Sequence, residues 1–248
     1  MSHHIVEVKE LKFTYPDKTP ALQGITFRIH HGESVAIVGG NGAGKSTLLL
    51  HLNGYLEPTS GLVRVGDYPL TRETVKEVRR TVGMVFQDPD DQLFMSTVRE
   101  DVAFGPLNLG LPPDEVDQRV DRALETVSLS HLKERPPHRL SSGQKRRAAI
   151  ASVLSMSPDI LVMDEPSAGL DPKARRNLIG LLESFKHTKI IATHDLDMVV
   201  DLCERTIVLH EGEVRADGPT GDIFADAPLL EDCRLEKPLR MQGCPICK

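Results

Sequence analysis

The sequence predicts an α/β protein whose core is combined with an antiparallel sheet at the N-terminus and with an inserted group of helices. Three observations lead to this prediction. The first thirty residues alternate between apolar and polar, short apolar runs of strand length recur later, and between two of these runs the apolar residues change to helical spacing. The chain has 248 residues, which is enough for one domain with a subdomain.

The N-terminal half of the predicted core begins with antiparallel strands, each with one buried face. The run Ser34–Val38 is continuously apolar, which is typical of a strand buried on both faces. A glycine-rich turn and an apolar helix over Ser46–Asn53 follow it, and Val82–Phe86 is a second candidate for a buried strand. The alternating residues of the N-terminal strands are Ile5, Val6, Val8, Leu11 and Phe13, followed by Ile25, Phe27 and Ile29.

The later part of the chain divides into a helical stretch, a return of the β/α rhythm, and a short C-terminal appendix. Helical spacing extends from about 97 to 156 and is interrupted by proline pairs. A strand over Ile160–Met163, a helix over Lys173–Phe185 and a strand over Lys189–Thr193 come next. We therefore expect one domain over residues 1–225, with the helical subdomain at about 97–156, and an appendix over 226–248.

Composition excludes several classes of protein. Hydrophobic residues make up 40% and charged residues 27% of the chain, which is typical of a soluble globular protein. A net charge of −6 argues against a nucleic-acid partner, and the basic run Lys145–Arg147 is interpreted as a solvated helix face. No apolar run approaches the ~18 residues that span a bilayer, and no signal peptide is visible. Four cysteines are too few for a disulfide scaffold, so a reducing cytoplasm is expected.

The glycine-rich turn fits the phosphate-binding pattern G-x-x-x-x-G-K-[ST] in full. Its glycines let successive backbone N–H groups converge on one anion, and the helix that follows adds its positive dipole end. Lys45 can then reach the β- and γ-phosphates of a nucleotide, and the Ser46 hydroxyl can bind Mg²⁺. The predicted nucleotide ligands of this P-loop are Gly39, Asn41, Gly42, Gly44, Lys45, Ser46 and Thr47.

Two carboxylates end the apolar run Ile160–Met163. A buried strand that stops at an acid places that acid at the carboxyl edge of the sheet, where the P-loop also opens. Asp164 is therefore a candidate for holding Mg²⁺, usually through water, and Glu165 is a candidate general base that polarises the attacking water. Together with the P-loop, this pair predicts a nucleotide triphosphatase.

The segment Leu140-Ser141-Ser142-Gly143-Gln144 separates the possible classes of triphosphatase, because it resembles the signature of the ABC ATPase family. The resemblance extends from about Ile5 to Phe224, and the family's other marks occur in the family's order. They are Tyr15 as the aromatic that stacks on adenine, Gln87 of the Q-loop, Ser167–Asp171 as the D-loop, and the switch histidine His194.

This resemblance implies the ABC ATPase fold, ATP and Mg²⁺ as cofactors, and roles for the matching residues. Gln87 would touch Mg²⁺ and the attacking water, and His194 and Glu165 would be the other catalytic residues. Ser141 and Gly143 would contact the γ-phosphate of ATP held by the opposite subunit of a head-to-tail dimer, formed with a second copy or a closely related ATPase. Asp171 would contribute to nucleotide binding. Ser142 departs from the family, which has glycine there, and this puts the turnover rate in doubt.

Further strings resemble the ATPases of energy-coupling-factor importers, which take up vitamins or transition metals. These strings are Asp88–Phe94, Val102–Gly110, Gln144–Ala151 and, more loosely, Ala168. Within this group, a single short chain of this kind resembles the ATPases of cobalt or nickel systems. The resemblance implies integral membrane transport subunits as partners and a peripheral position on the cytoplasmic face of the cell membrane. The acids Asp88, Asp90 and Asp91 could meet basic side chains of the membrane partner.

Alternative functions remain. One is an ATPase for another ABC importer or for an exporter. A soluble ABC ATPase of DNA maintenance usually has a long coiled coil or a zinc insertion between P-loop and signature, and this sequence has neither of them. A translation-type ABC protein needs two ATPase domains in one chain, whereas this sequence has one P-loop. The pair Cys244 and Cys247 fits either an inert tail or a metal-binding or redox pair.

Overall fold

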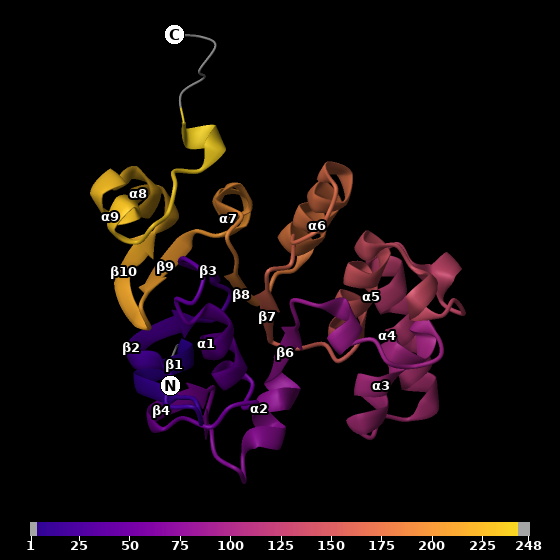
Figure 1. The fold of residues 1–248 in the computed structure, drawn as a ribbon. Helices are drawn as coiled ribbons and strands as arrows, with labels where there is room; N and C mark the ends of the chain where they lie inside the picture. Colours follow the sequence, from indigo (N-terminus) through magenta and orange to yellow (C-terminus); the bar gives the residue numbers. More distant parts are fainter. Residues whose placement is uncertain (1–3, 243–248) are drawn as a thin grey trace. The chain divides into compact units, whose positions relative to one another are not determined.

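The computed structural model describes residues 4–242, which form two compact units (Figure 1). The first unit comprises the residues up to Arg79 together with those from His187 onward, and the second comprises Arg80–Lys186. Cys244 and Cys247 lie outside the described residues. Among residues 4–242, no helix is both long and apolar enough to cross a membrane.

The first unit contains the predicted antiparallel sheet, with strand order β2-β1-β4-β5. Strands β1 (His4–Thr14) and β2 (Pro20–His30) form the predicted pair, in a register that places Val8 opposite Phe27. The sequence analysis did not predict β4 (Ser60–Val65) and β5 (Tyr68–Pro69). Of the apolar residues of the alternating pattern, Ile5 is half-buried and the others are buried: Val6, Val8, Leu11, Phe13, Ile25, Phe27 and Ile29.

The second sheet of the first unit holds the strand that leads into the P-loop. Strand β3 (Ser34–Val38) has the predicted bounds and pairs in parallel with both β8 (Thr188–Ala192) and β9 (Arg205–His210). Strand β10 (Glu213–Pro219) pairs with β9 in antiparallel fashion. The helices of this unit are α1 (Lys45–Leu52), α7 (Leu196–Leu202), α8 (Thr220–Ala225) and α9 (Ala227–Asp232), followed by the short turn η4 (Leu239–Met241).

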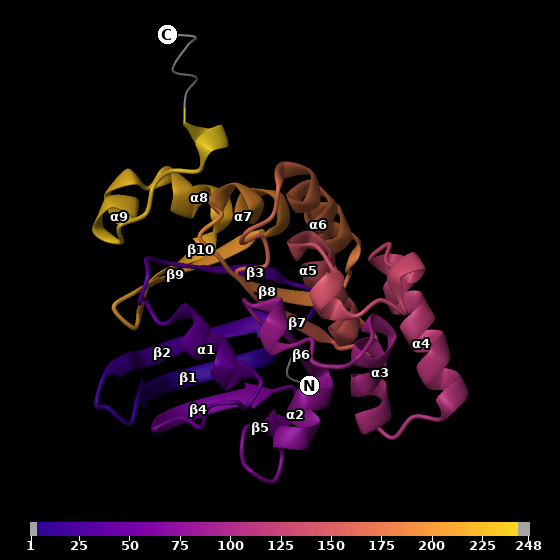
Figure 2. The same ribbon diagram turned by 45° about the vertical axis from the view of Figure 1, so that its right-hand side comes forward.

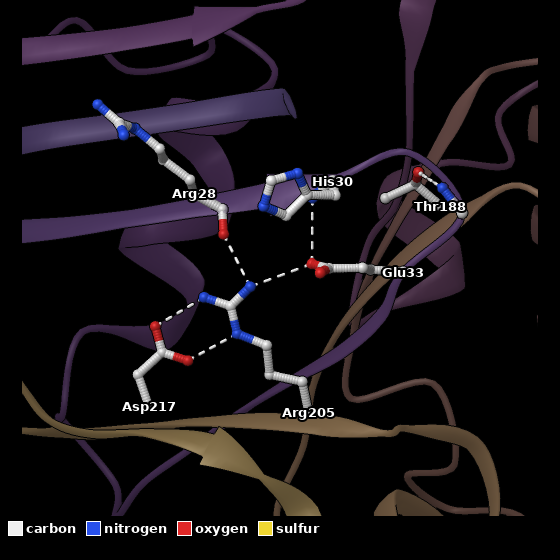
Figure 3. A network of polar contacts seen from close by, with 7 residues as sticks. Arg28, His30, Glu33, Thr188, Arg205 and Asp217 are labelled. Carbon is white, nitrogen blue, oxygen red and sulfur yellow. Dashed lines mark hydrogen bonds and ion pairs between the residues drawn. The ribbon is translucent and has the colours of Figure 1, made fainter. Parts of the chain in front are cut away.

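A polar network holds the amino-terminal edge of this sheet, opposite the P-loop (Figure 3). Arg205 at the start of β9 donates two hydrogen bonds of 2.7 Å to the Asp217 carboxylate of β10. The same guanidinium donates to the Arg28 carbonyl oxygen at the end of β2, at 2.8 Å, and to Glu33 Oε2 at 3.1 Å. One arginine thus connects both sheets of the first unit to the turn that precedes β3.

The second unit combines two parallel strands with a group of helices. Strands β6 (Val82–Val85) and β7 (Ile160–Asp164) pair with Val85 opposite Met163. Helices α3 (Val98–Asn108), α4 (Pro113–Thr126) and α5 (Ser142–Leu154) contact one another, and both views show them side by side (Figure 1 and Figure 2). Helix α6 (Pro172–Ser184) follows β7. The remaining elements are α2 (Val75–Thr81), in which the unit boundary falls, and the short turns η1 (Pro89–Asp91), η2 (Ser130–Leu132) and η3 (Pro137–Arg139).

The predicted fold class is confirmed: an α/β core, an antiparallel N-terminal sheet and helices between β6 and β7. The predicted helices over Ser46–Asn53 and Lys173–Phe185 begin and end within one residue of α1 and α6. The domain bounds 1–225, 97–156 and 226–248 stay a prediction.

Candidate active site

The P-loop turn is possible only with glycine at two of its positions. A Cβ on Gly39 would overlap the Leu209 carbonyl oxygen of β9. Gly44 has a φ of 100° at the start of α1, and a Cβ there would lie 2.7 Å from the Ala21 carbonyl oxygen. Because β2 and β9 approach the loop so closely, the backbone of the turn is held from two sides.

The ammonium group of Lys45 lies inside this turn. Its Nζ donates hydrogen bonds to the carbonyl oxygens of Gly39 at 2.8 Å and Gly40 at 3.1 Å, and the residue is only 9% exposed. The charge is therefore already at the loop where the pattern predicts phosphate. Ser46 in the first turn of α1 is exposed, and Thr47 is buried.

A column of aromatic rings supports α1 behind the P-loop. The Tyr15 hydroxyl and Thr47 Oγ1 are 2.8 Å apart and share a hydrogen bond. The Phe13 ring meets Tyr15 and His51 edge to face, with centroids 4.9 and 4.7 Å away. His51 is fully buried, its Nδ1 is 2.7 Å from the Thr47 carbonyl oxygen, and burial lowers the pKa of its ring below the ordinary value. Sequence reasoning singled out Tyr15 and Thr47 but missed His51, whose signal was its place one helical turn after Thr47.

His194 lies at the same sheet edge as the P-loop. Strands β3 and β8 run parallel with Ile37 opposite Ala192, so the segments that follow both strands emerge together at the carboxyl edge. Asp195 fixes the chain after the exposed His194: its N–H donates to Thr193 Oγ1 at 3.0 Å, and its carboxylate accepts from the Met198 N–H of α7 at 3.0 Å. The first unit thus brings together the P-loop and the predicted switch histidine.

In the second unit, the register of β6 and β7 places Gln87 and the Asp164–Glu165 pair at one sheet edge. Both carboxylates are buried, whereas Gln87 is exposed. Glu165 has a φ of 45°, a left-handed conformation that residues with a side chain rarely adopt. Backbone strain of this kind gathers at functional sites, which fits the predicted role of Glu165.

The signature segment begins α5, and Ser141 is its N-cap. The Ser141 side chain accepts from the Gln144 N–H at 3.3 Å, and the Gln144 side chain accepts from the Ser141 N–H at 2.9 Å. This reciprocal capping box leaves Ser141 exposed at the amino end of a 13-residue helix. Gly143 packs close to α6, since a Cβ there would lie 3.3 Å from Ala174 Cβ.

Asp171 has a structural partner of its own. Its Oδ1 accepts from the N–H groups of Lys173 and Ala174, both at 2.9 Å, so it caps α6. A nucleotide contact by Asp171 would therefore come from the exposed start of α6.

The interpretation of Lys145–Arg147 as a solvated helix face is wrong for Arg146. Arg146 is only 4% exposed, and its Nη1 donates to the Phe86 carbonyl oxygen at 2.9 Å. Lys145 binds both oxygens of Asp90, at 2.6 and 2.8 Å, and Arg147 donates to the Val127 carbonyl oxygen at 2.8 Å. A run of charges in a helix predicted exposure, but the loop that follows β6 covers this face of α5.

The donor atoms of the predicted Mg²⁺ ligands suit that ion. Ser46, Gln87 and Asp164 offer a hydroxyl, an amide oxygen and a carboxylate, which are the hard oxygen donors that Mg²⁺ prefers. Within residues 4–242, no group of three or more His, Cys, Asp or Glu side chains could hold a metal ion. Mg²⁺ commonly binds proteins through one or two such oxygens together with substrate phosphates, so the donor set fits.

A family model described as "ABC transporter" matches residues 22–168. A putative ABC transporter ATP-binding protein of Geobacter sulfurreducens is 73% identical, covering 100% of this chain and 99% of that protein. The energy-coupling factor transporter ATP-binding protein EcfA of Methanocaldococcus jannaschii is 47% identical, covering 95% of this chain and 86% of that protein.

Two solved structures share the fold. The structure of cbiO1 from Clostridium perfringens, described as part of the ABC transporter complex cbiONQ, is 44% identical with a TM-score of 0.82, covering 93% of this chain and 94% of that one. A dimeric ATP-binding cassette in a post-hydrolysis state with ADP and Pi is 29% identical with a TM-score of 0.79, covering 87% of this chain and 98% of that one.

Proposed function

This chain belongs to the ABC transporter family as an ATP-binding, ATP-hydrolysing subunit, and we propose that it powers an importer of the energy-coupling-factor type. The similarity to EcfA of Methanocaldococcus jannaschii and to cbiO1 of Clostridium perfringens supports this type of transporter. The sequence strings after Gln87 and around α3 point to the same type. Within it, a single short chain of this kind resembles the ATPases of cobalt or nickel systems, so we propose one of these ions as the cargo.

The observation that carries the proposal is the placement of motifs at strand ends in each unit. In the first unit the P-loop and His194 leave one sheet edge, and in the second unit Gln87, Asp164 and Glu165 leave one sheet edge. We assign ATP phosphate binding to the P-loop, with the Lys45 ammonium moving from its loop carbonyls to the β- and γ-phosphates. Tyr15 would lie against the adenine.

The catalytic roles follow from side-chain chemistry. Glu165 accepts a proton from the attacking water as general base, and Gln87 and His194 orient that water and the γ-phosphate. Ser46, Asp164 and Gln87 would hold Mg²⁺, which neutralises developing charge on the phosphates. Most of the rate enhancement then comes from positioning and charge stabilisation.

The proposed working unit is a head-to-tail dimer with a second copy or a closely related ATPase. The exposed Ser141 at the amino end of α5, together with Gly143, is suited to contact a γ-phosphate held by the other subunit. Asp171 at the start of α6 belongs to the same proposed contact with nucleotide. The similarity to a dimeric cassette supports this arrangement.

The proposed partners are integral membrane transport subunits, which would hold the chain at the cytoplasmic face of the cell membrane. An apolar patch supports a partner: Phe94, Phe104 and Leu107 are 62%, 41% and 58% exposed, and the two phenylalanine rings meet edge to face with centroids 5.0 Å apart. Asp90 is bound to Lys145 of the same chain, so the aromatic patch is better placed than Asp90 to receive an apolar helix of the partner.

The test is purification of the tagged chain from membranes of its own host in mild detergent. We expect an integral membrane protein to co-purify, and vesicles containing the complex with internal ATP to accumulate radioactive cobalt or nickel. Replacement of Phe94 and Phe104 by Ser should reduce co-purification without changing nucleotide binding. Co-purification without metal uptake would indicate another ABC transporter, and recovery of the chain without any membrane protein would contradict the importer.

A further inference from the structure

The backbone of Phe86, the residue before Gln87, is attached to the signature helix α5 at both of its polar groups. Its carbonyl oxygen accepts a hydrogen bond from Arg146 Nη1 at 2.9 Å. Its N–H donates to Gln92 Oε1 at 3.2 Å. The Nε2 of Gln92 in turn donates to the Ala149 carbonyl oxygen at 2.7 Å and to Ser152 Oγ at 2.9 Å, both on α5.

A third connection joins the loop that contains Gln87 to helix α5. Asp88 accepts from the Asp90 N–H at 2.9 Å and begins the turn η1, which directs the Asp90 carboxylate onto Lys145 of α5. This ion pair is exposed on the aspartate side and is therefore weak on its own. The segment from Phe86 to Gln92 is thus connected to three successive turns of α5.

The charged guanidinium of Arg146 carries a desolvation cost, because it is buried. The side chain is buried, and its Nε has no hydrogen-bond partner among the described residues. Burial lowers the pKa of the guanidinium, and the nearby carboxylates of Asp88, Asp164 and Glu165 oppose that effect. An apolar side chain of similar length would fill the space without this desolvation cost. Packing alone therefore gives no reason for an arginine at this position.

We propose that Arg146 and Gln92 are positioning residues that make the Gln87 loop and the signature helix move as one body. Arg146 is five residues from Ser141, roughly 7.5 Å along a rigid helix axis. A displacement of the loop at Phe86 is then transmitted to Ser141, and the proposed contact of Ser141 with the other subunit's ATP depends on the state of Gln87. This inference rests on the proposed function of Gln87 and Ser141.

The experiment compares Arg146→Met with Arg147→Met. Arg147 is the matched control, because it is the next residue of the same helix and also donates to a backbone carbonyl, that of Val127, away from the Gln87 loop. For Arg146→Met we expect kcat to fall about 10- to 100-fold, since small misplacements of reacting groups have effects of this size. The KM for ATP should stay within about twofold, because P-loop binding is separate. Arg146→Lys should recover part of kcat.

A second readout follows the signature directly. In a Glu165→Gln background, where the amide keeps the side-chain shape but removes the base, ATP should drive the dimer to accumulate on size-exclusion chromatography. Adding Arg146→Met should weaken this dimerisation while a fluorescent ATP analogue still binds to the chain. Adding Arg147→Met should not.

The outcomes separate the inference from the proposed function. If the wild type does not hydrolyse ATP, the proposed function fails. If it does, and Arg146→Met lowers kcat and dimerisation no more than Arg147→Met, the inference is overturned. If Arg146→Met does not fold, Gln92→Glu decides: it keeps the side-chain volume but loses both donated hydrogen bonds to α5, so it should lower kcat in the same way, and unchanged kcat would overturn the inference.

Discussion

At the scale of single residues, the helix that follows the P-loop depends on His51, a residue that no nucleotide motif includes. His51 Nδ1 is within hydrogen-bond distance of the Thr47 carbonyl oxygen, and the Thr47 hydroxyl shares a hydrogen bond with the Tyr15 hydroxyl. Burial against Phe13 favours the neutral form of the His51 ring, since a charge there would lack solvent. The first turns of the P-loop helix are therefore sensitive to protonation of a residue outside the motif.

We predict that His51 makes folding stability fall as the pH falls. Burial lowers the pKa of His51 below its ordinary 6.5, so below that pH the unfolded chain binds a proton that the folded chain does not. The contribution of neutral His51 to the free energy of unfolding is therefore complete above about pH 6.5. It is lost as the pH falls toward the pKa of His51 in the folded chain, by no more than about 1.4 kcal/mol per pH unit. His51→Asn keeps a donor for the Thr47 carbonyl oxygen and cannot titrate.

The measurement is urea unfolding of wild type and His51→Asn at a series of pH values between about 5 and 8. The free energy of unfolding should decrease more steeply toward acid in the wild type than in the variant. Parallel curves for the two proteins would show that His51 does not titrate differently on folding.

At the scale of elements, the segments that the sequence predicted are ones whose local pattern agrees with their surroundings, although the apolar and buried strand β9 was not predicted. Ser34–Val38 is apolar throughout and is buried on both faces, so its bounds were predicted correctly. Strand β10 was missed because its side chains are all exposed or half-buried and it contains Gly218 and Pro219, which resemble a loop. Arg146 was placed on the surface because its burial depends on a loop more than fifty residues away in the chain. The local sequence pattern does not show that a distant segment will cover a side chain in the folded protein.

The Arg205 network belongs to this scale, because it joins β2, β9 and β10 (Figure 3). We predict that Arg205→Met lowers the free energy of unfolding by about 1.5–3 kcal/mol, the usual range for hydrogen bonds to charged groups. Arg28→Met is the matched control: its side chain is 61% exposed and pairs with Glu7 at the surface, so the expected loss is below about 1 kcal/mol.

Thermal unfolding of the two variants measures this difference. Arg205→Met should have the lower melting temperature, while kcat per folded molecule stays unchanged because the network lies at the sheet edge opposite the P-loop. Equal melting temperatures for the two variants would contradict the structural role of Arg205.

At the scale of the whole molecule, the proposed residues are distributed over both compact units. The first unit holds Tyr15, Lys45 and His194, and the second holds Gln87, Glu165 and the signature. The order of these motifs in the sequence was sufficient to predict the family. The sequence alone was not sufficient to predict which groups support them, because His51 and Arg146 act through backbone carbonyls that any residue could supply.

The central claim is an ATPase whose sites are shared between two subunits, and mixing two inactive variants tests it most directly. Lys45→Ala removes the phosphate-binding ammonium, and Ser141→Arg blocks the signature. Each should be inactive alone. In an equal mixture about half of the dimers are hybrids, each with one intact site, so activity should return to about one quarter of the wild-type rate. No recovery on mixing, with both variants folded and hybrid dimers present, or wild-type activity of either variant alone, would contradict the shared site.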